Sequence, residues 1–250
     1  VAAAGMKFAF IKVGSTKSGI DPNFASNITN AQAAGLKTGV YIYSYATTPE
    51  AAAQEADLVL QWISNYTVNY PVVFDIEDKC QRNLSNQQLI DIINAFCTKI
   101  DAAGYYPMVY SYKNMFAGKL SICGWDKWVA QYNNSCDYNN NVCFWQYSSY
   151  GNVSGFGSRV DVNYQYKDYS NLIIPEGFID HNGNTRFYRN WRMQRGWVDY
   201  NNTRYYLDGA GNLVRGWFAD ETGTYYLTPG DGSIARGQSV IDGAGYYFTA

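Results

Sequence analysis

The strongest constraint in this sequence is a regular alternation of short β-rich runs with amphipathic helical segments between residues 7 and 167. The β-rich runs predict strands at residues 7–13, 38–45, 71–77, 105–111, 127–132 and 142–147. Such alternation is typical of parallel sheets with crossover helices. Neither a G-x-G-x-x-G nor a Walker sequence follows any run, which disfavours a nucleotide-binding open sheet. The pattern therefore predicts an α/β domain, an irregular β/α (TIM-like) barrel, whose reacting groups lie at the carboxyl ends of the strands.

Helix-starting sequences support this interpretation. Three of them precede the helical segments: Asp21-Pro22, Thr48-Pro49, and a capping box formed by Ser85 with Gln88. Apolar residues three and four positions apart follow the second and third of these starts, so each of those two helices is expected to bury one face.

Charge and composition exclude several kinds of function. The 250 residues include 19 basic and 21 acidic side chains, and the formal charge of −2 argues against nucleic acid as a partner. No apolar run approaches the roughly 20 residues of a membrane-spanning helix, so we expect no membrane insertion. His181 is the only histidine, which excludes His-based triads and most His-built metal sites. We expect no metal and no cofactor, and chemistry carried by carboxylates.

The five cysteines show neither a C-x-x-C pair nor zinc-ligand spacing. Cys136 and Cys143 flank an Asn-rich loop, where a local disulfide would suit an extracellular protein. Reduced thiols are an equally good interpretation, and the sequence does not decide between them.

A change of composition after about Asn171 predicts two domains, residues 1–170 and residues 171–250. In the second domain a glycine recurs at intervals of 19, 20 and 21 residues, at Gly177, Gly196, Gly216 and Gly237. An aromatic pair follows each glycine, at Phe187-Tyr188, Tyr205-Tyr206, Tyr225-Tyr226 and Tyr246-Tyr247. A period near 20 that combines glycine turns with aromatic pairs predicts a small all-β hairpin-repeat solenoid, in which each hairpin buries its face against the next.

Two acidic residues end the strand predicted at residues 71–77. Asp75 and Glu77 are two residues apart, so an extended strand places them on one face with Cα atoms about 6.5 Å apart. Burial of two neighbouring carboxylates costs desolvation and repulsion, and a pair with one acid protonated suits cleavage of a glycosidic bond. The alternative is a structural role, in which the pair caps the next helix or binds a cation together with Asp78.

Aromatic and amide side chains lie at the ends of several predicted strands. Together they predict a groove suited to amino sugars, with Tyr41, Tyr43, Tyr110, Gln131, Tyr132 and Gln146 as candidate substrate-binding residues. For some of them, ordinary packing inside the barrel is the alternative.

Residues 1–165 resemble glycoside hydrolase family 25 in the order and spacing of several short sequences: K-F-A-F-I-K-V, G-V-Y-I-Y-S-Y, F-D-I-E-D, W-V-A-Q-Y, W-Q-Y and V-D-V-N. The resemblance implies an N-acetylmuramidase lysozyme that hydrolyses the β-1,4 bond between N-acetylmuramic acid and N-acetylglucosamine in bacterial peptidoglycan. It also implies that Glu77 is the general acid, that Asp75 assists it or stabilises developing positive charge, and that Asp161 is a further active-site carboxylate. Direct attack by water and attack by the substrate's acetamido group both remain open.

The resemblance has one departure. The family's barrel begins with a strand that bears another active-site Asp, and no matching sequence precedes Val1. The first five residues, V-A-A-A-G, predict the last turn of a helix. We therefore expect a fragment with an open or distorted barrel and weak muramidase activity.

The repeats of the second domain are similar to the cell-wall-binding repeats of choline-binding modules and their glucan-binding relatives. In the choline version, tryptophan and tyrosine rings cage a quaternary ammonium group. The resemblance implies binding of a cell-wall polymer by Trp197, Tyr205, Tyr206, Trp217, Tyr225 and Tyr226. Arg204, Thr224 and Gly245 replace the ring that precedes each Tyr pair, which argues against choline itself as the ligand. A purely structural stack is the alternative.

Two hypotheses of function follow. The first is an extracellular, cell-wall-associated or phage-encoded muramidase whose repeats hold it on its insoluble substrate. The second is a non-catalytic cell-wall carbohydrate-binding protein with a degenerate barrel. A chitinase-like hydrolase is disfavoured, because the D-x-x-D-x-D-x-E run is absent before Glu77.

Overall fold

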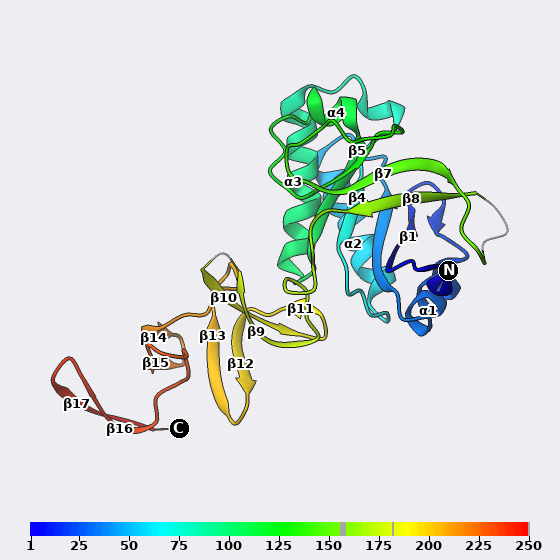
Figure 1. Cartoon of the computed structure of the whole chain (residues 1–250). Coiled ribbons are helices and arrows are strands. Elements are labelled where there is room, and N and C mark those ends of the chain that lie inside the picture. Colours follow the sequence, from blue (N-terminus) through cyan, green and yellow to red (C-terminus); the bar gives the residue numbers. More distant parts are fainter. Residues whose placement is uncertain (156–158, 182, 250) are drawn as a thin grey trace. The chain divides into compact units, whose positions relative to one another are not determined.

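A computed structural model describes residues 1–155, 159–181 and 183–249 of the chain. The chain divides into two compact units, Val1–Ile173 and Ile174–Ala250 (Figure 1).

The first unit is built on a curled eight-stranded sheet. Its strands are β1 (Phe8–Ser15), β2 (Gly19–Ile20), β3 (Lys37–Tyr43), β4 (Val72–Asp75), β5 (Pro107–Tyr112), β6 (Lys127–Ala130), β7 (Val142–Gly151) and β8 (Val160–Gln165). The spatial order is β2-β1-β3-β4-β5-β6-β7-β8, with antiparallel strands only at the two edges. Within the described part of the chain no pairing joins β8 to β1 or β2, so the sheet stays open. This architecture confirms the predicted irregular, TIM-like β/α fold.

Helices cover one face of the sheet (Figure 1). They are α1 (Phe24–Ala33), α2 (Pro49–Ile63), α3 (Asn86–Ala102) and α4 (Lys113–Ala117), with short 3₁₀ turns η1 (Ala2–Ala4) and η2 (Lys79–Gln81). The predicted starts of α2 and α3 are confirmed, because Thr48 and Ser85 each accept a hydrogen bond from a backbone N–H of the first turn. The predicted start of α1 is wrong by two residues. The Asp21 carboxylate accepts from the backbone N–H of Asn23, and this turn delays the helix to Phe24.

Alternation along the strands separates two environments. Valine, isoleucine and phenylalanine side chains point toward the helices and form the core with them, as in Val40, Ile42, Phe74, Val109 and Val129. The other face carries a network of contacting rings inside the curl, made by Phe8, Phe10, Tyr70, Trp128, Phe144 and Tyr169. The helices thus fix the strands from outside, and the inside of the curl is left to aromatic and polar groups.

The second unit is a series of small antiparallel sheets, as the repeats predict. A three-stranded sheet of β9 (Glu176–His181), β10 (Asn184–Arg189) and β11 (Arg192–Met193) comes first. Three hairpins follow: β12 (Gly196–Tyr200) with β13 (Thr203–Leu207), β14 (Gly216–Asp220) with β15 (Gly223–Leu227), and β16 (Gly237–Ile241) with β17 (Ala244–Phe248).

The recurring glycines have a backbone role. Gly196, Gly216 and Gly237 are the first residues of their hairpins and have φ angles of 74°, 85° and 69°. These values lie in the left-handed region that residues with a Cβ atom rarely adopt. The spacing of about 20 residues between these glycines in the sequence therefore reflects one left-handed glycine at the start of each hairpin.

The five cysteines are free thiols, so the local disulfide between Cys136 and Cys143 is not formed and the reduced interpretation holds. None of the helices among the described residues has the length and apolar character needed to cross a bilayer.

Candidate active site

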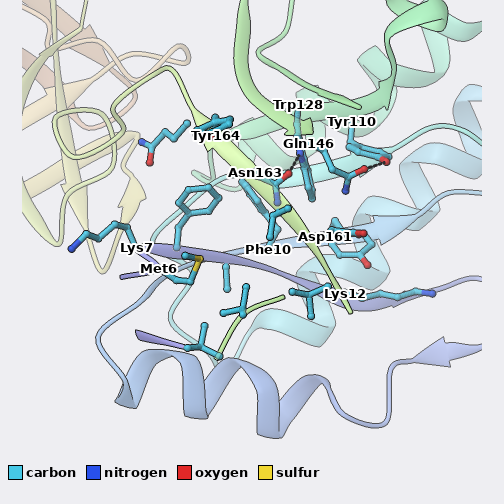
Figure 2. A pocket seen from close by; sticks show the side chains of 18 of the residues that line it. Met6, Lys7, Phe10, Lys12, Tyr110, Trp128, Gln146, Asp161, Asn163 and Tyr164 are labelled. Carbon is cyan, nitrogen blue, oxygen red and sulfur yellow. Dashed lines mark hydrogen bonds between the residues drawn. The ribbon is translucent and has the colours of Figure 1, made fainter. Parts of the chain in front are cut away.

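A cavity of about 740 Å³ lies inside the curl of the first unit (Figure 2). Asp75 at the end of β4, Glu77 just beyond it and Asp161 on β8 all line this cavity. The structure therefore brings together the three acids that the sequence analysis selected. Lys12 and Asp161 lie toward one end of the cavity in Figure 2, and Met6 and Lys7 toward the other.

Asp75 is buried without satisfaction of its charge. Its exposed fraction is 4%, and its Oδ1 has no hydrogen-bond partner among the described residues. Burial raises the pKa of Asp75 well above its ordinary value, and the charge of Glu77 raises it further, while Lys12 opposes both effects. The Asp75 carboxyl group thus favours holding a proton.

Glu77 lies in a related but more open environment. Burial raises its pKa, and the charges of Asp161 and Asp78 add to the rise. Interactions with the hydroxyl groups of Tyr112 and Tyr110 act in the opposite direction. In turn, burial and the charge of Glu77 raise the pKa of Tyr112 to about 12. Glu77 is therefore a carboxyl group with a raised pKa and tyrosine hydroxyls beside it, which are features that suit a proton donor.

Asp161 completes the set from the antiparallel edge strand β8. Burial raises its pKa as well. Burial thus raises the pKa of all three carboxyl groups that line the cavity, which favours their protonated forms relative to exposed acids.

Capping of the following turn, one of the two structural alternatives for the pair, is carried out by a different residue. Asp78 rather than Asp75 or Glu77 caps the following turn η2, where it accepts a hydrogen bond from the backbone N–H of Cys80 at 2.9 Å. Residues 1–155, 159–181 and 183–249 contain no group of three or more His, Cys, Asp or Glu side chains placed to hold a metal ion.

Four of the six predicted substrate-binding residues line the cavity: Tyr41, Tyr43, Tyr110 and Gln146. The Gln146 Oε1 accepts hydrogen bonds from the hydroxyls of Tyr110 at 2.9 Å and Tyr132 at 3.0 Å. Tyr132 is connected to the cavity through this contact but does not line it, and its exposed fraction is 55%.

The sixth residue, Gln131, is not brought into the cavity. Its side-chain oxygen accepts from the backbone N–H of Asp137 at 3.2 Å, and its backbone carbonyl accepts from the indole N–H of Trp145 at 2.7 Å. Its structural place is therefore in the loop after β6.

Lys12, Trp128 and Asn163 line the cavity but were not selected from the sequence. The Trp128 indole N–H donates to the Asn163 Oδ1 at 2.7 Å, which fixes the ring plane inside the cavity (Figure 2). Lys12 had a detectable signal, because it shares the alternation of Phe8 and Phe10 and ends an otherwise apolar strand face. The Trp128–Asn163 contact joins residues 35 positions apart, which no local pattern predicts.

Five of the six predicted tail residues belong to two aromatic clusters between successive hairpins. The first tail cluster is Trp197, Tyr206, Phe218 and Tyr225. The second tail cluster is Trp217, Tyr226, Tyr246 and Phe248. The sixth residue, Tyr205, is elsewhere: it is 8% exposed and packs in a small core with Phe178 and Phe187, because its side chain points to the other face of β13. The role in cell-wall binding predicted for Tyr205 stays a prediction, for a ring that lies in this small core.

The first unit matches a known family and several known proteins. The sequence model of the family described as Glycosyl hydrolases family 25 matches residues 1–156. The protein YegX of Escherichia coli O157:H7, which is described as uncharacterized, is 30% identical over 165 residues, covering 63% of this chain and 58% of that protein. The autolytic lysozyme of Clostridium acetobutylicum is 25% identical over 166 residues, covering 65% and 50%.

Among solved structures, the modular autolysin LytC of Streptococcus pneumoniae in complex with a synthetic peptidoglycan ligand superposes with a TM-score of 0.57 at 28% identity. The match covers 63% of this chain and 40% of LytC. The chain spans about half the length of the curated relatives it matches. The family match over residues 1–156, more than half of the chain, shows that this protein belongs to glycosyl hydrolases family 25.

Proposed function

We propose that the first unit is an N-acetylmuramidase, which hydrolyses the β-1,4 bond between N-acetylmuramic acid and N-acetylglucosamine in peptidoglycan. The observation that carries the proposal is the pair of buried, unpartnered carboxyl oxygens of Asp75 and Glu77 in an aromatic cavity of about 740 Å³. A folded protein retains such a pair at a cost in stability, and glycosidic cleavage uses a protonated acid beside an ionised one.

In this proposal Glu77 protonates the leaving oxygen. It is less buried than Asp75, and the hydroxyls of Tyr110 and Tyr112 beside it orient the carboxyl group. The charge that develops on the sugar is positive, so the ionised form of Asp161 stabilises the oxocarbenium-like state. Asp75 lines the same cavity, holds a proton under the influence of Glu77, and assists Glu77 when the Glu77 proton is transferred.

The walls of the cavity suit an amino sugar. Rings of Tyr41, Tyr43 and Trp128 offer apolar faces against which pyranose rings stack. The Gln146 amide retains its N–H donors, because the two tyrosine hydroxyls use its oxygen. An acetamido carbonyl is a matching acceptor for these donors.

The relatives support the choice of polymer. One is named an autolytic lysozyme, and the other is an autolysin whose structure holds a peptidoglycan ligand. We assign the protein to the bacterial cell wall, as an extracellular autolysin or a phage-encoded lysin, with the repeats of the second unit as its wall-binding part. Tethering by these repeats would raise the local substrate concentration without any change in the active site.

The experiment is mass spectrometry of the fragments released from purified peptidoglycan. The wild-type chain is expected to release fragments with N-acetylmuramic acid at the reducing end, and Glu77→Gln to release none. Glu50→Gln is the matched control, since Glu50 is fully exposed in the first turn of α2. Reducing ends on N-acetylglucosamine would overturn the bond assignment. Release of no fragment by the wild-type chain would leave a non-catalytic wall-binding protein.

Wall binding is tested separately by co-sedimentation of the full chain with insoluble cell walls. We expect Trp217→Ala, which removes the central ring of the second tail cluster, to reduce the bound fraction. Equal sedimentation of Trp217→Ala and wild type would contradict a role of this cluster.

A further inference from the structure

The first tail cluster contains a cation that belongs to the chain itself. The register of β12 with β13 pairs Trp197 with Tyr206 and Asp199 with Arg204, so these four side chains share one face of the hairpin. The guanidinium carbon of Arg204 lies 5.0 Å from the centre of the Trp197 ring. This distance is within the range of a cation–π contact.

Charged groups hold this arrangement from two sides. The Arg204 Nε donates to the Asp199 Oδ1 at 3.0 Å, which keeps the guanidinium next to the indole. The Trp197 indole N–H donates to the Asp220 Oδ2 of the following hairpin at 2.8 Å. Arg204 is thus held by Asp199 over the Trp197 ring, and the Asp220 carboxylate is held at the N–H of the same ring.

Three further rings pack around Trp197. The Trp197 ring centre is 5.2 Å from that of Tyr206, 5.7 Å from that of Phe218 and 4.8 Å from that of Tyr225. Tyr206 and Phe218 are themselves only 3.9 Å apart. The first tail cluster is therefore a group of contacting rings around Trp197 with two carboxylates beside it, and Arg204 covers the Trp197 ring while 44% of its own side chain stays exposed.

The second tail cluster repeats the pairing of a tryptophan with a tyrosine but lacks the charged side chains of the first cluster. The register of β14 with β15 pairs Trp217 with Tyr226 and Ala219 with Thr224, so Thr224 stands where Arg204 stands one hairpin earlier. In the next hairpin the register places Ile241 at the position of Asp220 and Ser239 at that of Phe218. Trp217 has an exposed fraction of 45%.

We propose that Arg204 is an intramolecular plug, which fills the cation position of the first tail cluster and closes it to external ligands. The second tail cluster, which Thr224 leaves without such a plug, is then the ligand-contacting cluster of the tail. Any effect of this difference between the two tail clusters on wall binding rests on the proposed function of the tail. The plug itself is independent of that function and is tested with a small cation.

The groups that remain when the Arg204 side chain is removed indicate which class of ligand the site would bind. Without the guanidinium, the Trp197 face would adjoin two carboxylates, those of Asp199 and Asp220, with no counter-charge from Arg204. Such a site attracts a compact organic cation of the quaternary ammonium class, by cation–π and charge–charge attraction together. In the wild-type chain this cation site would be present, but the Arg204 guanidinium would occupy it.

The experiment is a titration of the full-length chain with tetramethylammonium chloride, with sodium chloride added to hold the ionic strength constant. Binding is followed by the indole N–H signals of Trp197 and Trp217 in nuclear magnetic resonance spectra. We expect Arg204→Ala and Arg204→Gln to shift the Trp197 signal saturably, with a Kd at least about tenfold below that of the wild type. Arg204→Lys retains a cation and is expected to resemble the wild type.

Thr224→Ala is the matched control, because it changes the equivalent position of the next hairpin without removing a charge, and the Trp197 titration is expected to be unchanged. A saturable Trp197 shift in the wild type as strong as in the two uncharged variants would overturn the plug. Absence of any Trp197 shift in Arg204→Gln with retained near-ultraviolet circular dichroism would overturn it as well. Neither result would affect the co-sedimentation test, so the plug and the wall-binding proposal fail separately.

Discussion

Two aspartates at opposite ends of the same sheet are little exposed, Asp75 at 4% and the Asp126 side chain at 10%, and their hydrogen-bond environments differ. Asp126 precedes β6 at the amino ends of the parallel strands, where its Oδ2 accepts from Lys167 Nζ at 2.7 Å and from the hydroxyls of Tyr169 and Tyr106 at 2.8 and 3.0 Å. Burial raises the pKa of Asp126, but these three donors outweigh it and hold the pKa below its ordinary value.

Asp75 at the carboxyl end of β4 has the opposite balance, because burial dominates, Glu77 adds to it and Lys12 compensates only in part. The sheet thus satisfies a carboxylate completely at one end and leaves one unsatisfied at the other. The comparison teaches that burial of charge is not by itself a mark of function. The buried acid that lacks donors and faces a cavity is the one available for chemistry.

The largest expected effect concerns Glu77. Glu77→Gln keeps the shape of the side chain but cannot donate a carboxyl proton, so kcat/KM on peptidoglycan is expected to fall by about 10²–10⁴-fold. Turbidity loss of a cell-wall suspension measures it. Asp126→Asn, assayed under conditions where it is folded, should retain kcat/KM within about threefold. A larger loss in Asp126→Asn than in Glu77→Gln would reverse the roles of the two ends.

Stability is expected to show the reverse order. Asp126→Asn leaves the Lys167 ammonium without its counter-charge, and the free energy of unfolding should fall by about 2–3 kcal/mol at neutral pH. The Asp126 pKa is lowered on folding, so this contribution is present above its ordinary value and is lost as the pH falls through the folded-state value. Urea denaturation at neutral and strongly acidic pH measures the difference.

Asp57→Asn is the control for that measurement, because the Asp57–Lys99 pair is exposed and its loss should change the free energy of unfolding by less than about 1 kcal/mol. Equal effects of the two substitutions would mean that the Asp126 network contributes no more than a surface pair.

Asp75→Asn should stabilise the protein while it impairs catalysis. Folding raises the pKa of Asp75, so the folded state binds a proton that the unfolded chain releases, and stability falls as the pH rises from the ordinary value through the raised one. An amide removes this fall, and we expect a gain of about 1 kcal/mol in the free energy of unfolding at neutral pH that shrinks in acid. A gain that does not depend on pH would point to altered packing instead.

The smallest expected effect is that of Lys12. Its charge opposes the rise in the pKa of Asp75, the group that holds a proton in the proposed mechanism, so Lys12→Met should move the alkaline limb of the activity profile to higher pH, by less than about one pH unit. Lys7→Met is the matched control, because Lys7 also lines the cavity but lies toward the other end (Figure 2). A shift of the limb to lower pH would contradict the electrostatic assignment of Lys12.

The sequence predicted those parts of the fold and site that depend on neighbours along the chain. The start of α2 and α3 follows from Thr48 and Ser85, whose side chains bond to N–H groups three residues away. The pairing of Asp75 with Glu77 in one cavity follows from the period of a strand. The start of α1 was missed because Asp21 bonds to a closer N–H and forms a turn first.

Other features depend on contacts between distant segments and have no local pattern. Gln131 belongs to the same predicted strand end as Tyr132, but the loop that follows folds back and takes its side chain. Trp128 is oriented by Asn163, and Trp197 is covered by Arg204 and bonded to Asp220. The substitution of Arg204 for an aromatic ring was visible in the sequence, but its position over the indole required the register of the hairpin.

The glycines that begin the hairpins carry a consequence for how this tail tolerates change. A Cβ built on Gly196, Gly216 or Gly237 would meet nothing within 4 Å, so the restriction at these positions is one of chirality and not of room. A D-amino acid, for which a positive φ is natural, would fit all three, and among the ordinary residues asparagine is the best-tolerated replacement. New side chains introduced there would project into open space, which makes these positions attachment points for labels or cross-links that leave both aromatic clusters intact.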